Sequence, residues 1–212
     1  ESQAPPIVAA VSTPGSATTP VPTVPVPTVP LSTTPVPASQ LAALNLEEVL
    51  LQTGDLPESF TKRQVSKSAP FDFRNAPKST VQAMDIALNN DNLNAGNISV
   101  VLYSTTTERD QAYDALIAAK RNSRLPVLDP TQPTPTPEPV SAAAGIGEQA
   151  VQFGVSEHIS YNSSTELAFK RCAAVMLIKF NFEGSRQQRA ALARRYAQRL
   201  DARLAPLICQ PL

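Results

Sequence analysis

The feature that most constrains this fold is an apolar strand followed directly by an amphipathic helix near the C-terminus. Residues 172–178 are almost all hydrophobic, and polar and apolar residues then alternate to Phe182, as expected for a central strand. Gly184 ends this pattern, and Ser185 is placed to cap a helix. Apolar residues recur after it at helical spacing: Ala193, Tyr196 or Ala197, Leu200 and Leu204. This strand and its covering helix are therefore the best-defined unit of the chain.

Strand, turn and helix patterns also follow one another through the preceding residues. Strands are expected over residues 60–65, 81–88, 98–103, 149–155 and 166–171, and helices over residues 45–54 and 105–121. Residues 89–97, rich in asparagine, are expected to form a long turn. The order strand, turn, strand, capped helix occurs twice, which indicates two structural pseudo-repeats. We therefore predict an α+β fold with a largely antiparallel sheet covered by helices.

Most of the 21 prolines fall in two blocks, residues 5–37 and 126–139. Residues 1–39 carry Pro, Thr, Val and Ser with no charge after Glu1, so they cannot bury enough surface to offset their ordering entropy. We predict a disordered stalk over residues 1–39 that favours extended polyproline II, with a plain disordered tail as the alternative. A single domain then occupies residues 40–212. The Pro-rich connection at 126–139 is either mobile or laid across its surface.

Charge and hydropathy limit the partners of the chain. The formal net charge is zero, so nothing global points to nucleic acid. No apolar run approaches the roughly 18 residues that a membrane span needs, and we expect a soluble monomer. The chain begins at Glu1 rather than Met, which we take as a sign of processing. Membrane attachment is therefore expected only through an N-terminal anchor outside this chain, in an extracytoplasmic, cell-envelope or secreted protein.

The two cysteines, Cys172 and Cys209, fit this location. In a secreted chain an isolated pair usually forms a disulfide, and we predict one between them. The alternative is two buried thiols in a cytosolic protein. Together with the single histidine, His158, they provide too few ligands for a metal site, so neither a metal nor a cofactor is expected.

Short motifs that could carry chemistry have simpler explanations. Residues 59–62 match S-x-x-K, but neither S-D-N nor K-T-G follows. Residues 145–147 lack the third glycine of a dinucleotide loop. His158 lies between serines and Glu157 in an expected hairpin loop, where an exposed histidine is the simpler reading. Residues 89–97 offer Asp91 as their only carboxylate, too few for a calcium loop. No catalytic residue is predicted.

The last predicted helix is strongly basic. A solvated polar face is the default explanation, because long arginine side chains cover a helix well. The alternative is that Arg194 and Arg195 contact an anionic partner such as an envelope polymer, lipid headgroups or an acidic protein. The arginines of this helix are Arg186, Arg189, Arg194, Arg195, Arg199 and Arg203.

Three segments resemble landmarks of bacterial surface lipoproteins and of the extracellular sensor domains of bacterial transmembrane Ser/Thr kinases, with some PsbP-like lipoproteins also similar. They are L-L-Q-T-G-D-L-P-E-S-F at residues 50–60, G-I-G-E-Q-A-V-Q-F at 145–153, and A-F-K-R-C-A-A-V-M-L-I-K-F at 168–180. Cys172 stands where the resembling hairpins carry glycine. The resemblance implies an extracytoplasmic sandwich with a ligand cleft, and it transfers no catalytic residues.

Together these observations predict a tethered extracytoplasmic domain, a lipoprotein by resemblance, that binds an unknown ligand or envelope partner without catalysis. A structural or assembly role in the cell envelope is the alternative. A hydrolase with an unrecognised site is the third reading. Binding would require a concave site with a few polar groups, and a scaffold would require only an exposed patch.

Overall fold

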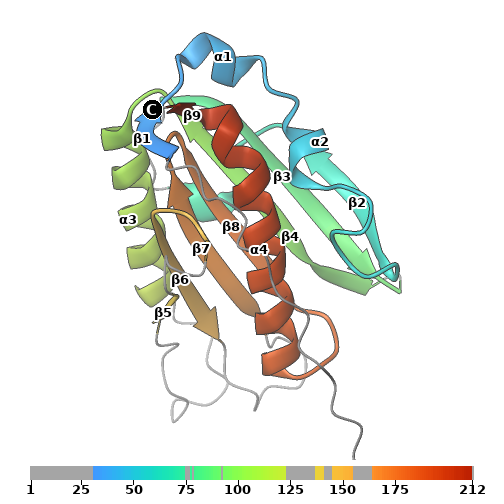
Figure 1. The fold of residues 1–212 in the computed structure, drawn as a ribbon. Helices are drawn as coiled ribbons and strands as arrows, with labels where there is room; N and C mark the ends of the chain where they lie inside the picture. The colour runs from blue at the N-terminus through green and yellow to red at the C-terminus, as the bar shows by residue number, and fades with distance from the viewer. Residues whose placement is uncertain are drawn as a thin grey trace, which may run out of the picture.

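The central feature of the fold is one seven-stranded antiparallel sheet (Figure 1). The computed structural model describes residues 31–74, 77, 79–91, 93–122, 137–140, 145–154 and 164–211. The strand order is β2-β3-β4-β8-β7-β6-β5. The strands are β2 (Phe60–Ser66), β3 (Thr80–Asn90), β4 (Leu93–Tyr103), β5 (Pro137–Val140), β6 (Gln149–Gly154), β7 (Thr165–Arg171) and β8 (Ala174–Phe180). The predicted α+β fold with an antiparallel sheet is therefore confirmed.

The strand order explains the repeated pattern in the sequence. The runs β2-β3-β4 and β6-β7-β8 meet at β4 and β8, which pair antiparallel at the centre of the sheet. Each run ends in a helix, α3 (Thr106–Asn122) after β4 and α4 (Arg186–Ile208) after β8. The two helices pack on opposite faces of the sheet, so the repetition holds for the strands and not for the placement of the helices.

Side-chain alternation along the strands builds a separate core on each face. On β8, Met176 and Ile178 point to α4, while Val175 and Leu177 point to α3. The α4 core also contains α1 (Ala38–Ala42) and α2 (Leu46–Leu50). Burial on both faces explains why residues 174–178 read as a continuous apolar run rather than an alternating one.

Helix α4 begins at a capping box. The Ser185 hydroxyl accepts the Gln188 backbone N–H at 3.1 Å, and the Gln188 side chain accepts the Ser185 N–H at 2.8 Å. The helix runs to Ile208, four residues beyond the predicted apolar stripe, although it contains Pro206. The Tyr196 hydroxyl, buried against the sheet, donates to the Leu50 carbonyl oxygen and so ties α4 to α2.

Replacing Ser185 with alanine is expected to lower the free energy of unfolding by about 1 kcal/mol, because the Gln188 N–H loses its acceptor. Urea unfolding followed by circular dichroism measures this change. Ser185→Asn is the matched control, since asparagine is an equally good N-cap residue and should stay close to the wild-type stability. A loss of the same size in both variants would contradict a capping role.

The predicted long turn at residues 89–97 is wrong. β3 continues to Asn90 and β4 starts at Leu93, so most of this segment forms a tight hairpin with Asp91 at a positive φ of 49°. Gly96 pairs with Phe180 inside the sheet, where an added Cβ would lie 1.8 Å from the Lys179 carbonyl oxygen. Asparagine and glycine read as turn residues, but pairing with β3 and β8 overrides that local preference.

The N-terminal boundary also differs from the prediction. β1 (Leu31–Pro35) lies inside the predicted stalk and pairs antiparallel with β9 (Cys209–Pro211). Residues 31–34 are a proline-free run with two threonines, which leaves backbone N–H groups available for pairing. The remainder of the predicted stalk, residues 1–30, lies outside the described residues. β1 and β9 form a two-stranded sheet of their own, and β5, at one edge of the seven-stranded sheet, carries Pro137 and Pro139, which an edge strand tolerates.

Candidate functional site

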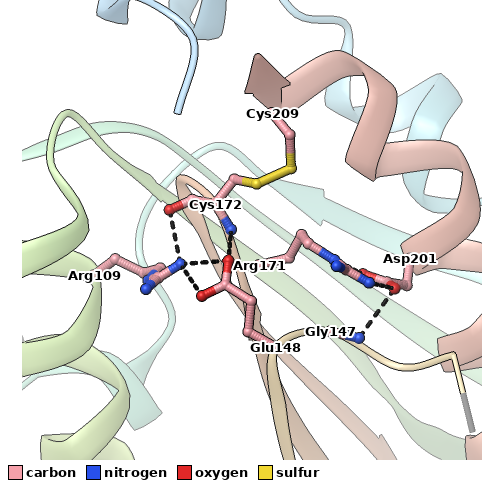
Figure 2. The surroundings of a disulfide bond; sticks show 7 residues. All are labelled: Arg109, Gly147, Glu148, Arg171, Cys172, Asp201 and Cys209. Carbon is pink, nitrogen blue, oxygen red and sulfur yellow. Dashed lines mark hydrogen bonds and ion pairs between the residues drawn. A yellow bond between two sulfur atoms is a disulfide. The ribbon is translucent and has the colours of Figure 1, made fainter. Parts of the chain in front are cut away.

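A disulfide joins the β7–β8 hairpin to the end of α4. Arg171 pairs with Ala174, so Cys172 and Ala173 form the hairpin turn, and Cys172 has a φ of 43°. Cys172 therefore lies in the turn and not at the start of the central strand, in a conformation that favours glycine. Its sulfur is bonded to that of Cys209, with the two Cα atoms 5.4 Å apart (Figure 2).

Two ion pairs brace the same hairpin (Figure 2). Arg109 donates from Nη1 to both Glu148 carboxylate oxygens at 2.8 Å and to the Cys172 carbonyl oxygen at 3.0 Å. Glu148 also accepts the Cys172 N–H at 2.7 Å. On the other side, Arg171 donates from Nε to Asp201 at 3.0 Å, and this carboxylate accepts the Gly147 N–H. These charges satisfy each other, so this cluster is structural.

The arginines of α4 mainly hold the helix in place. Arg194 donates from Nε to the buried Gln152 side chain on β6 at 2.7 Å, while Arg195 is exposed and makes no described bond. Of the two residues predicted to contact an anionic partner, Arg195 alone is thus uncommitted within the described residues. The other bonds are Arg186 to Glu138, Arg189 to the carbonyls of Phe182 and Gly184, Arg199 to the Gly54 carbonyl, and Arg203 to Asp55.

The best candidate site lies on the α3 face of the sheet, past the C-terminal end of α3. Here the apolar core gives way to polar and charged side chains on four adjacent strands and on the two segments beside them. We call this group the polar platform. Its members are Asp72, Asp85, Asn97, Ser99, Lys120, Glu166 and Lys179.

Strand register places the platform residues side by side. Asp85 on β3 pairs with Ser99 on β4, Asn97 on β4 pairs with Lys179 on β8, and Lys179 pairs with Glu166 on β7. All point to the same face, since they alternate with residues of the α4 core along their strands. The platform therefore crosses the middle of the sheet, from β3 to β7.

One end of the platform is a partly buried network of ion pairs that joins α3 to the sheet. Lys120, in the last turn of α3, pairs with Glu166 at 2.7 Å and with Asp72, next to the exposed Phe71. Burial alone would lower the pKa of Lys120, but Glu166 and Asp72 outweigh it and raise that pKa. Lys120 is therefore held as a cation that fixes the end of α3 to β7.

The other end of the platform is a positioned carboxylate. Asp85 is half-buried, and its oxygens accept the Ser99 hydroxyl at 2.6 Å and the Asn97 amide at 3.2 Å. Ser99 is only 2 % exposed, so the surrounding packing holds its hydroxyl in place to donate to Asp85. Among the described residues, no lysine or arginine pairs with Asp85. Its charge is therefore held in place without being neutralised.

Lys179 supplies a cation on the more exposed side of the same ion-pair cluster. Its ammonium lies 3.5 Å from Glu166, which is already bonded to Lys120 at the shorter distance of 2.7 Å. The Lys179 side chain is 36 % exposed, compared with 12 % for Lys120. The platform thus presents one carboxylate and one ammonium to solvent, with Asn97 between them.

Sequence reasoning missed the platform, and one signal could have revealed it. Asp85 and Lys179 each interrupt a strand whose other residues are mostly apolar, and Glu166 directly precedes the apolar residues 167–169 of β7. The sequence could not show that they share a face, because that depends on the pairing of β4 with β8. His158, weighed above as a loop residue, lies outside the described residues.

Across the described ranges, no helix is both long and apolar enough to cross a membrane. In the same part of the chain, no three His, Cys, Asp or Glu side chains are grouped so that they could hold a metal ion.

Comparison with known proteins gives one structural likeness. No family model matches the chain, and no curated protein matches it. The extracellular domain of PknH from Mycobacterium tuberculosis is similar in structure, with a TM-score of 0.45 and 11 % identity over 81 % of this chain and 100 % of that one. A likeness this low transfers neither a ligand nor a role.

Proposed function

We propose that this chain is an extracytoplasmic, non-catalytic domain that binds a small polar ligand on the polar platform. The observation that carries the proposal is Asp85, a carboxylate positioned by Ser99 and Asn97 yet paired with no cation. Ligand sites typically combine a few such oriented polar groups with a preformed scaffold. The central strand β4 pairs with β3 on one side and with β8 on the other, and this part of the sheet provides that scaffold.

Binding is favoured over catalysis by the state of the buried charges. A general base works best with a pKa near the working pH, whereas the pKa of Lys120 is moved upward by its carboxylate partners. The disulfide supports an extracytoplasmic location, since such bonds persist in oxidising compartments. Attachment through a lipid or other anchor upstream of the Pro-rich segment is part of the same proposal.

Native mass spectrometry of the protein purified from its own compartment tests this function. We expect the native spectrum to show a bound mass that is absent after denaturation, and that the double variant Asp85→Asn/Lys179→Gln lacks. The matched control is Asp114→Asn/Lys67→Gln, which removes the same charges from exposed positions. A bare wild-type chain, or equal retention by both double variants, would reject the platform as a binding site.

A further inference from the structure

We propose that the ligand of the polar platform is a small zwitterion, whose ammonium binds Asp85 and whose carboxylate binds Lys179. This inference rests on the proposed function and adds the chemical class of the ligand. It depends on two charges of opposite sign that lie on one face of the sheet without pairing with each other.

Asp85 is unusual among the carboxylates of this domain. Within the described residues, every other buried or half-buried carboxylate either pairs with a lysine or arginine or lies in the first turn of a helix. Glu108 is the helix case, where it accepts the Thr105 hydroxyl and backbone dipoles favour negative charge. The paired cases are Glu47, Asp55, Asp72, Asp110, Glu148, Glu166 and Asp201.

Asp85 and Lys179 form no ion pair with each other among the described residues. They lie on β3 and β8, on either side of β4, so their backbones are about 10 Å apart across the sheet. Asn97 on β4 occupies the space between, as it pairs with Lys179 in the register and donates its amide to Asp85. Each charge is therefore held at its own position, with an amide between them.

This arrangement matches a ligand that carries both charges. An ammonium at Asp85 would gain a charge-assisted hydrogen bond to a carboxylate that is already oriented by Ser99. A carboxylate at Lys179 would replace Glu166, which lies 3.5 Å from that ammonium and would keep its shorter 2.7 Å bond to Lys120. A ligand with a single charge would satisfy one end and leave the other open. The site therefore favours a free amino acid, a short peptide or a related amino carboxylate.

The test uses three probes of matched chain length: 6-aminohexanoate, hexylamine and hexanoate. Chemical-shift titration of the ¹⁵N-labelled protein reports the position and affinity of each. We expect 6-aminohexanoate to shift the amides of residues 83–87, 97–99 and 177–179 and to bind at least tenfold more tightly than either singly charged probe. Asp85→Asn should weaken the binding of 6-aminohexanoate and hexylamine about tenfold and leave that of hexanoate unchanged. Lys179→Gln should weaken the binding of 6-aminohexanoate and hexanoate about tenfold and leave that of hexylamine unchanged.

Exposed-charge variants serve as controls, since Asp114→Asn and Lys67→Gln should bind all three probes like the wild type. Urea unfolding of each variant checks that the sheet is intact, and Lys179→Gln tests the inference if Asp85→Asn does not fold. Equal binding of hexylamine and 6-aminohexanoate would overturn the zwitterion but keep the platform as a cation site. If none of the probes shifts the platform amides, the zwitterion inference is also overturned. If the native mass spectrum of the wild type still shows a bound mass that the Asp85→Asn/Lys179→Gln variant lacks, the platform is a binding site and only the ligand class was wrong.

Discussion

Replacing Cys172 and Cys209 with alanine is expected to lower the free energy of unfolding by about 4 kcal/mol, the chain-entropy value for a loop of this length. The two cysteines are 37 residues apart, and the loop they close contains all of β8 and α4. Without the bond, the unfolded chain regains the freedom of that loop, while the folded packing changes little. Equilibrium urea unfolding of both proteins measures the difference.

Reduction provides the matched control. Wild-type protein unfolded and refolded in a thiol reductant should have the stability of the double alanine variant. Both cysteines are almost fully buried, at 0 % and 1 % exposure, so a small thiol should reduce the native protein only as fast as it opens. A difference below about 1 kcal/mol, or rapid thiol labelling of the native protein, would contradict a structural disulfide.

Removing the disulfide should first destabilise the two short strands near the chain ends, β1 and β9. β9 begins at Cys209, and its partner β1 is the described segment closest to the Pro-rich residues. The Val36 N–H also donates to the Ile208 carbonyl oxygen at 3.2 Å. The disulfide thus fixes β9, and through it β1, beside the β7–β8 hairpin.

The sequence predicts best those elements in which local pattern and tertiary packing agree. The last strand of the sheet is predicted to Phe182 and ends at Phe180, and Ser185 caps α4 as predicted, because apolar period and capping residue favour the same structure. The hairpin at Asn90 was missed since asparagine and glycine favour turns, and only the neighbouring strands make the extended form the more stable one. β1 was missed for the same reason, as its partner lies at the other end of the chain.

The candidate site could not be predicted to the same extent, because it is a property of register. Asp85 and Lys179 are remote in sequence, and they share a surface only since β4 pairs with β3 on one side and β8 on the other. A charged residue inside an apolar strand is visible in the sequence. Which face it occupies, and whether a partner neutralises it, follows from strand order.

Arg109 carries the second large expected effect. Replacing it with methionine should lower the free energy of unfolding by about 3–5 kcal/mol, because Glu148 is left without its cation beside the Cys172 backbone. The Arg109 side chain is 4 % exposed and Glu148 is 19 % exposed, so water can compensate only in part. The Cys172 carbonyl oxygen loses its donor as well. Urea unfolding of the variant measures the loss.

The double variant Arg109→Met/Glu148→Met separates the two contributions. If the cost of Arg109→Met is mainly an unpaired carboxylate, removing that carboxylate should recover much of the stability, and the cycle gives the coupling energy. Lys62→Met is the surface control, since its pair with Glu47 is 45 % and 39 % exposed and should cost less than about 1 kcal/mol. Additive losses in the double variant would show that Arg109 acts through packing and its carbonyl bond, and the Glu148 carboxylate would then be stabilised by the Cys172 N–H instead.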